Sequence, residues 1–303
     1  MRLIHDSITL LLSCAAVCLA ALFSSCDKEE HEGEHGLAVS LSWMDEDDLG
    51  TPVGDIKLWI YNTDDGSLAG EYEYSDTRQL ARTLHPLPAG NYTVVAATNL
   101  VAPFEADKSA DNSLISYENL LFRIGEPSSS PKHAHYGVTA VTVAGSSITK
   151  AQVPLKRILS ELTIRIEGIP ENAILSGYVN NSSTGLFPVL KDPEGNFGIA
   201  TAETLPTEIQ STKSSDAVLL TTTLHLMPTV TGADWSRLSL HLAMADGKGY
   251  DYTLEAPVMK PAGKYIIEMK YQDMKPFMRL SAISINGWTE GWIINGEVLN
   301  PEE

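Results

Sequence analysis

The stretch Leu37-Ala-Val-Ser-Leu-Ser-Trp43 decides the fold class of this chain. Its large apolar residues recur at every second position, which places them together on one face of a β-strand. The same alternation returns over 56–60, 162–166 and 238–244. No stretch shows a sustained helical period. The pattern therefore predicts an all-β protein built from half-buried strands.

Frequent turn signals divide the chain into short strands. They are Asp65-Gly66, Ala89-Gly90, Gly145-Ser146, Asp246-Gly247 and Ala262-Gly263. Glycine supplies the positive φ that tight hairpin turns require. Short strands at this spacing are typical of a β-sandwich.

A short motif that occurs twice in the chain indicates two such units. Pro88-Ala-Gly-Asn-Tyr92 and Pro261-Ala-Gly-Lys-Tyr265 each lead into an apolar strand, and each follows a strand with an Asp-Gly turn. The chain is also long enough for two domains of ~100–150 residues. We therefore expect two related sandwiches, over 37–154 and 155–303. A Gly-Ser turn followed by a fresh strand at Lys156 marks the boundary.

An apolar segment from Ile8 to Phe23 ends on two serines and Cys26, and charged residues follow at once. The segment is shorter than the ~20 apolar residues that a membrane-spanning helix needs, so it reads as a cleaved export signal. Small residues directly before a cysteine resemble a bacterial lipobox. We therefore expect a lipoprotein signal peptide over 1–25, a lipid-carrying Cys26, and a short acidic tether over 26–36.

The two other cysteines, Cys14 and Cys18, lie inside the expected leader. Removal of 1–25 leaves 278 of the 303 residues, with Cys26 as their single thiol. No internal disulfide and no cysteine-based nucleophile or metal site is then available, so core packing must stabilise the fold. Acyl chains on Cys26 would hold the protein at a membrane, since two chains suffice for stable anchoring.

The charge of the chain limits the classes of partner that it can bind. It carries 39 acidic residues against 21 Lys and Arg, a formal net charge of −18. Such a chain repels phosphates, which argues against nucleic-acid binding and against adhesion to anionic lipid without an acyl anchor. The sequence contains no Gly-rich phosphate loop and no G-x-S-x-G elbow, so we expect no enzyme and no cofactor.

Two patterns resemble metal sites. His31-Glu-Gly-Glu-His35 matches the H-E-x-x-H of zinc peptidases, but that chemistry needs a rigid buried helix and this motif lies in the charged tether. Asp45-Glu-Asp-Asp48 lacks the spaced acidic residues and glycine of a calcium loop. We expect solvated segments at both places, exposed loop histidines at His133 and His135, and no metal site.

Five tryptophans support an alternative function, a surface that stacks on sugar rings. They are Trp43, Trp59, Trp235, Trp288 and Trp292. Trp59 is opposite in phase to Leu58 and Ile60, which predicts that it faces the other side of its strand. Core or interface packing is the more common use of tryptophan. A glycan-binding surface lipoprotein therefore stays the alternative, and it requires two or three coplanar exposed Trp or Tyr in one patch.

The order of these features resembles a known family. The lipobox leader and tether precede Leu37–Trp43, then 55–62 with its Asp-Gly turn, then 87–99, and 155–164 opens the second half. This order is similar to that of the fimbrial anchor lipoproteins related to FimB, which are associated with the fimbrillin-A class of type V pili. The resemblance covers nearly the whole chain. It implies two tandem transthyretin-like β-sandwiches and no catalytic residues.

The resemblance also implies a location and a partner. Such a protein is lipid-anchored in the outer membrane, exposed at the cell surface, and joined to a fimbrial stalk subunit by β-strand addition, in which main-chain hydrogen bonds bind an extra strand. Stalk subunits of such pili lose their first strand after an Arg, but this chain has no Arg between Cys26 and Arg78. It would therefore donate a strand.

The candidate donor is the tail over 280–299, whose alternating apolar positions would fill the pockets of a stalk subunit. Those positions are Leu280, Ala282, Ile283, Ile285, Trp288, Trp292, Ile293, Ile294 and Val298. The same alternation also fits a tail that completes its own sandwich. The sequence leaves both readings open.

Overall fold

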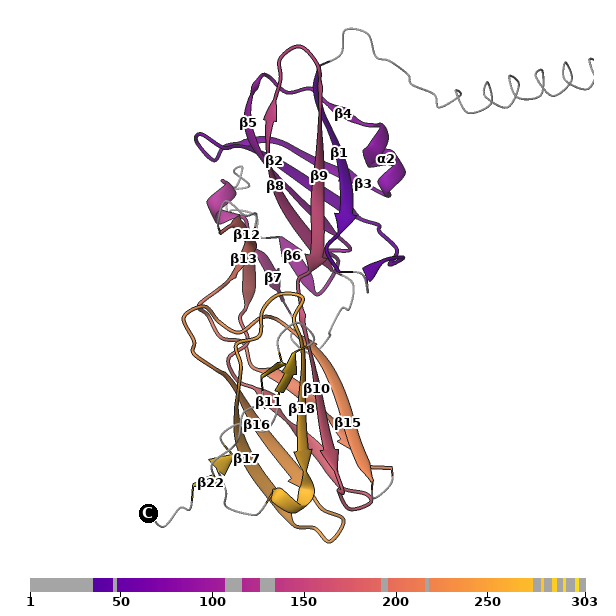
Figure 1. Cartoon of the computed structure of the whole chain (residues 1–303), viewed down its shortest axis with the longest axis vertical. Coiled ribbons are helices and arrows are strands. Elements are labelled where there is room, and N and C mark those ends of the chain that lie inside the picture. The colour runs from indigo at the N-terminus through magenta and orange to yellow at the C-terminus, as the bar shows by residue number, and fades with distance from the viewer. Residues whose placement is uncertain are drawn as a thin grey trace, which may run out of the picture. The chain divides into compact units, whose positions relative to one another are not determined.

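The structure is a computed structural model of the chain (Figure 1). It describes residues 35–45, 48–106, 116–125, 134–191, 196–215 and 218–274, together with the backbone of four short strands beyond them. Strands dominate these residues, and one short α-helix, α2 (Thr77–Arg82), is capped by the Asp76 carboxylate. The predicted all-β class is confirmed.

Seven strands of the first half form one β-sandwich. They are β1 (Gly36–Trp43), β2 (Ile56–Asn62), β3 (Leu68–Tyr74), β4 (Leu84–His85), β5 (Gly90–Thr98), β8 (His135–Val143) and β9 (Ile148–Arg157). One layer has the order β3-β2-β5-β8 and the other β4-β1-β9. The layers join where the start of β8 pairs with the end of β9. Leu37, Val153 and Leu155 of one layer pack against Leu58 and Val94 of the other.

Seven strands of the second half form another sandwich. They are β10 (Ser160–Glu167), β11 (Ile174–Val179), β14 (Thr207–Lys213), β15 (Leu219–Leu226), β16 (Ser236–Ala243), β17 (Gly249–Ala256) and β18 (Lys264–Lys270). The layers have the orders β14-β11-β16-β17 and β15-β10-β18. The core between them includes Leu162, Ile164 and Ile267 from one layer and Leu238 and Leu240 from the other.

The two sandwiches share one topology. In each, the first strand (β1 or β10) lies between an antiparallel neighbour (β4 or β15) and the parallel last strand (β9 or β18). The other layers match strand for strand, with every neighbouring pair antiparallel. The prediction of two related tandem β-sandwiches is therefore confirmed.

The repeated Pro-Ala-Gly-x-Tyr motif, however, precedes strands that are not equivalent in the two sandwiches. Pro88–Tyr92 leads into β5, whose counterpart is β16, whereas Pro261–Tyr265 leads into β18, whose counterpart is β9. The strand alignment inferred from the repeated motif is wrong, although the conclusion of a duplicated sandwich holds. A short turn motif recurs wherever a strand needs the same start, so it does not identify the strand.

The glycine of this motif makes room for the tyrosine ring. An added Cβ at Gly263 would lie 2.6 Å from the Tyr265 ring, and one at Gly90 would lie 3.4 Å from the Tyr92 ring. Residues two apart in a strand share a face, so the ring folds back over the glycine. Positive φ falls instead at Ala262, with φ 61°. In the Asp-Gly turns, by contrast, the glycines have the positive φ that the sequence predicted.

A further four-stranded sheet joins residues from both halves of the chain. It consists of β6 (Phe104–Ala106), β7 (Phe122–Ile124), β12 (Gly185–Leu190) and β13 (Phe197–Ala200), in the order β13-β12-β7-β6. Phe122 and Phe197 share an apolar cluster with Trp59 of β2 and Tyr136 of β8. The predicted limits at 154 and 155 thus remain a prediction, because strand pairing crosses them here.

This sheet explains why β2 is apolar on both faces. Leu58 and Ile60 point into the sandwich core, while Trp59 lies in the cluster beneath the further sheet and is 4% exposed. The indole N–H of Trp59 donates to the Glu71 carboxylate at 3.0 Å. The expectation that Trp59 faces the other side of its strand is confirmed.

Candidate anchoring and assembly sites

The expected lipid site lies outside the described residues. These begin at His35, which is exposed, so the leader, Cys26 and most of the His31–His35 motif stay predictions. Over the part of the chain that the structure describes, no helix is long and apolar enough to cross a membrane.

The tail contributes four short strands to the edges of the second sandwich. They are β19 (Arg279–Leu280), β20 (Ile285–Gly287), β21 (Gly291–Trp292) and β22 (Val298–Leu299). β19 pairs with β17 in parallel, and β20 pairs with β18 antiparallel over three positions. β21 and β22 then extend these additions. The tail side chains lie outside the described residues, so their proposed role as a donor is untested.

The tail therefore pairs at the edge of each layer of the second sandwich. Without it, β18 and β17 would each end their layer with unpaired main-chain groups. Such an edge is a template for another strand. The tail strands pair with strands of their own sandwich. This is one of the two arrangements that the alternating sequence left open.

The root of the tail is fixed to the sandwich. Met274 is 3% exposed, and its carbonyl accepts a hydrogen bond from the Tyr252 hydroxyl at 3.2 Å. Burial, with smaller effects of Tyr271 and Tyr250, raises the pKa of Tyr252 to about 12, so this donor keeps its proton. The chain beyond Met274 thus starts from a defined point.

A cluster of charges lies where β9 passes into β10. The Arg157 guanidinium approaches Asp45 at 3.2 Å, Asp48 at 3.5 Å and Glu161 at 3.7 Å. Glu161 also lies 3.3 Å from Nε2 of His225. Ile158 and Leu159, the two residues between the strands, are buried. The connection is therefore packed and ion-paired along its length.

This cluster corrects two expectations. Asp48 is 6% exposed and does not lie in a solvated loop, because the fold turns it inward toward Arg157. His135 is fully buried in β8, with Nε2 3.5 Å from Asp48 and its ring against Trp43 at 4.7 Å. Each burial depends on a partner far away in the sequence, Arg157 for Asp48 and Asp48 for His135, so no local pattern indicated either one. Among the described residues no group of His, Cys, Asp or Glu is arranged to hold a metal ion.

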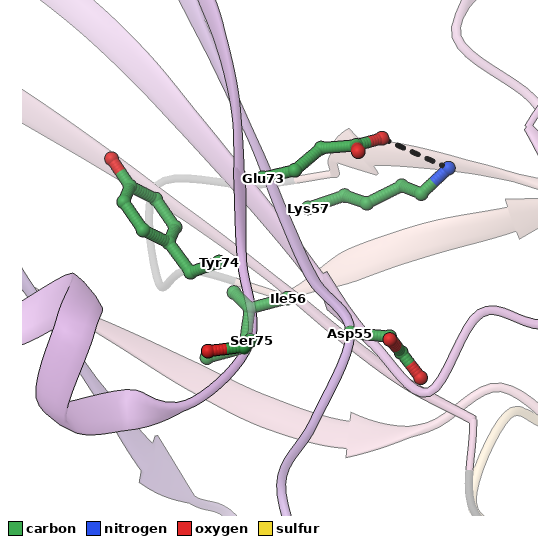
Figure 2. A pocket seen from close by; sticks show the side chains of 6 residues that line it. All are labelled: Asp55, Ile56, Lys57, Glu73, Tyr74 and Ser75. Carbon is green, nitrogen blue, oxygen red and sulfur yellow. Dashed lines mark ion pairs between the residues drawn. The ribbon is translucent and has the colours of Figure 1, made fainter.

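A shallow pocket of about 230 Å³ lies between the ends of β2 and β3 (Figure 2). Its lining is Asp55, Ile56, Lys57, Glu73, Tyr74 and Ser75. Figure 2 shows the Lys57 and Glu73 side chains pointing toward each other, and their charges are 3.4 Å apart. The pocket lining contains no histidine or cysteine.

The aromatic residues do not form the patch that a sugar platform needs, as far as the structure describes them. Trp43 is half-buried, and the side chains of Trp288 and Trp292 lie outside the described residues. Trp235 and Tyr178 are both 47% exposed. Tyr178 pairs with Ser239 of β16, four residues after Trp235, which separates the two by about 13 Å at strand spacing. No sequence pattern singled out Tyr178.

Comparison with known proteins now places this architecture. The sequence model of the family described as fimbrillin-A associated anchor proteins Mfa1 and Mfa2 matches residues 25–294. The chain belongs to this family. The resemblance drawn from the motif order is thereby confirmed, and the family is one of fimbrial anchor proteins. The matched range includes Cys26 and most of the tail.

Solved structures share the fold at low sequence identity. The fimbrial anchor protein Mfa2 from Porphyromonas gingivalis has a TM-score of 0.54 and 12% identity, covering 86% of this chain and 99% of that one. A candidate adhesin from Bacteroides thetaiotaomicron has a TM-score of 0.55 and 12% identity, covering 84% and 96%. A candidate polysaccharide-binding protein from the same organism has 0.53 and 12%, covering 89% and 99%. No curated protein sequence matches the chain.

Proposed function

We propose that this protein is a structural subunit that anchors a fimbrium to the outer membrane through lipid on Cys26. The observation that carries the proposal is the family match from residue 25 to residue 294, because the family is one of fimbrial anchors. The apolar leader that ends on Cys26 supports the lipid. The protein would then face the cell surface, with the fimbrial stalk as its partner.

The burial of the first strand supports a permanent tether. In β1, Leu37 is fully buried and Val39 is 2% exposed, and the strand pairs with β9 over eight positions. No Arg precedes it after Cys26, so an Arg-specific protease has no site at which to remove it. Loss of β1 would also expose the core of the first sandwich. The lipid end therefore stays joined to the folded protein.

We further propose that the tail over 280–299 joins the stalk by strand addition. The edges of β17 and β18 are where the tail now pairs, and strands that pair at an edge are exchangeable between chains. In this proposal the domain limits are 37–154 and 155–303, and the tail belongs to the second domain. Leaving its own sandwich, the tail would enter the groove of the first stalk subunit.

The lipid is tested by replacing its attachment atom. In cells that produce the fimbrium, Cys26→Ala should move fimbriae from the cell surface into the medium. Cys14→Ala, inside the expected leader, is the matched control and should leave fimbriae on the cells. Both variants are compared by the share of fimbrial subunit in the medium. Fimbriae that stay cell-bound with Cys26→Ala would rule out the lipid as the anchor.

The donor tail is tested by locking it in place. Ile266 of β18 and Asn286 of β20 are directly paired, so the double change Ile266→Cys and Asn286→Cys should form a disulfide across them. A locked tail should no longer capture the purified stalk subunit, and reduction should restore capture. Ile266→Cys alone is the control. Equal capture by the locked and reduced forms would contradict donation, while deletion of 280–303 would provide a second check if the remainder stays folded.

A further inference from the structure

The terminal strands of each sandwich have a mechanical consequence. β1 and β9, the first and last strands of the first sandwich, run parallel from the pair Gly36–Ile148 to the pair Trp43–Leu155. β10 and β18, the first and last strands of the second, run parallel over seven pairs. In both sandwiches the chain thus enters and leaves on adjacent strands that point the same way.

This parallel arrangement decides how an applied force acts. The chain enters at the N-terminal end of the first strand and leaves at the C-terminal end of the last, which are opposite ends of one ladder. A pull between them slides the strands along each other, so all the ladder hydrogen bonds resist together. A pull on two neighbouring ends would instead open the bonds one at a time. Parallel ladders have evenly spaced, slanted bonds that share such a sliding load.

We propose that the two sandwiches are shear clamps in series that carry tension from the membrane to the fimbrium. The inference rests on the proposed function, because only an anchor held at Cys26 and gripped beyond β18 is pulled in this direction. The duplicated topology then has a mechanical purpose. Because the clamps are in series, each ladder carries the full tension, and the anchor keeps its length until the weaker ladder slides.

The point where tension enters the first clamp is reinforced. Nδ1 of His85 in β4 donates to the Leu37 carbonyl at 2.8 Å, since a carbonyl can only accept. Nε2 of the same ring then accepts from the Tyr74 hydroxyl at 2.6 Å. Burial lowers the pKa of His85, which favours this neutral form. The start of β1 is therefore held by a side-chain bridge to β3 as well as by its ladder.

The connection between the clamps has little slack. Ile158 and Leu159 are 0% and 4% exposed and pass directly into β10. At the start of β10 the Ser160 hydroxyl donates to the Lys260 carbonyl at 2.8 Å, and the Glu161 amide donates to Gly263 at 2.8 Å. Tension leaving β9 thus reaches the β10–β18 ladder without a flexible linker.

Single-molecule force spectroscopy tests the direction of loading. The unlipidated chain from Cys26 to Glu303 contains the whole compact unit 35–303 and has one thiol, which serves as the first handle. Gln272→Cys, exposed just after β18, provides the second handle for the sliding pull. Ser146→Cys, exposed in the turn before β9, provides the matched control, because it pulls the adjacent starts of β1 and β9 apart.

We expect the first unfolding force in the sliding pull to be at least about twofold higher than in the control at the same loading rate, since forced unfolding follows the barrier along the pulled path. Equal or lower force in the sliding pull would overturn the inference. The purified protein needs no stalk for this measurement. A failed fimbrial release assay with Cys26→Ala would instead count against the anchor role, so the two failures are distinguishable.

A disulfide identifies which ladder resists. Ser40 of β1 and Gln152 of β9 are paired and exposed, so Ser40→Cys with Gln152→Cys should bridge the first clamp when oxidised before the handles are attached. In the sliding pull the oxidised form should lose the extension of residues 41–151, and reduction should restore it. If the extension of residues 41–151 in the reduced form occurs without a force peak before it, the β1–β9 ladder does not carry the force.

Discussion

The guanidinium of Arg157 and the carboxylate of Asp48 lie 3.5 Å apart, and their side chains are only 11% and 8% exposed. Nε2 of His135 approaches the same Asp48 oxygen at 3.5 Å. The structure thus encloses a carboxylate between two basic groups where the first sandwich meets the start of β10. A charge removed from water in this way depends on its partners for compensation.

Replacement of Arg157 by Met should therefore destabilise the protein strongly. The change leaves Asp48 buried without its guanidinium, and removal of one member of a buried pair costs about 3–5 kcal/mol. Urea unfolding followed by circular dichroism measures the loss. The control is Arg165→Met, because Arg165 pairs with Glu268 at 3.3 Å on the surface, with both side chains more than 40% exposed. That change should cost less than about 1 kcal/mol, and equal losses would contradict the role given to burial.

A substitution at Gly198 should reveal its contact with Tyr136. Gly198 has φ +93°, and an added Cβ would collide with the buried Tyr136 hydroxyl. Gly198→Ala should cost about 1–3 kcal/mol for overpacking, beyond the backbone strain of about 1–2 kcal/mol. Gly66→Ala, at φ +69° with open space around it, should show the backbone strain alone.

The same site allows a double-mutant test. The Tyr136 hydroxyl is buried and has no hydrogen-bond partner among the described residues. Tyr136→Phe alone should therefore change stability little, and in the Gly198→Ala background it should recover part of the loss. Additive losses in the cycle, measured by urea unfolding, would exclude a direct clash.

Lys156 should give the protein a distinct alkaline pH dependence. Its Nζ donates to the Phe197 carbonyl at 2.7 Å and lies 4.0 Å from the centre of the Phe197 ring. Burial, with a smaller effect of Lys191, lowers the pKa of Lys156 to about 8 from 10.5. Between those values the unfolded chain holds a proton that the folded chain has lost. The contribution of Lys156 to the unfolding free energy should therefore rise with pH across this window.

The measurement is the unfolding free energy of the wild type minus that of Lys156→Met, at steps from pH 7 to 10.5. The difference should be flat below about pH 8 and climb above it. Lys248→Met is the control, because Asp246 raises the pKa of Lys248 and its contribution should therefore not rise over that window. A flat difference for Lys156→Met throughout would show that its pKa is not lowered.

The glycan-binding alternative makes its own prediction. Tyr178 and Trp235 are the exposed aromatic side chains that a sugar could meet on the β11–β16 face. Tyr178→Ala with Trp235→Ala should change stability by less than about 0.5 kcal/mol, as is usual for surface positions. If the protein is an anchor, the double change should leave fimbriae on the cells. Loss of binding to cell-surface polysaccharide, with fimbriae retained, would favour the alternative.

Local pattern was sufficient for much of this protein. Strict alternation in Leu37–Trp43 predicted β1, and the opposite phase of Trp59 correctly predicted that it faces the other side of its strand. The Asp-Gly turns matched hairpins because a short turn with positive φ at glycine needs only local sequence. The buried states of His135 and Asp48 had no such signal, since their partners come from distant strands.

The sequence by itself determined the all-β class, the positions of several strands and, through the order of its motifs, the family. Each depends on the period-2 alternation of a strand or on short turns, which act over a few residues. Only the tertiary structure decided which strands are neighbours. The parallel pairing of β1 with β9 joins residues more than 100 positions apart, and the tail strands pair with β17 and β18. Partner choice depends on non-local packing and edge closure, which alternation alone cannot specify.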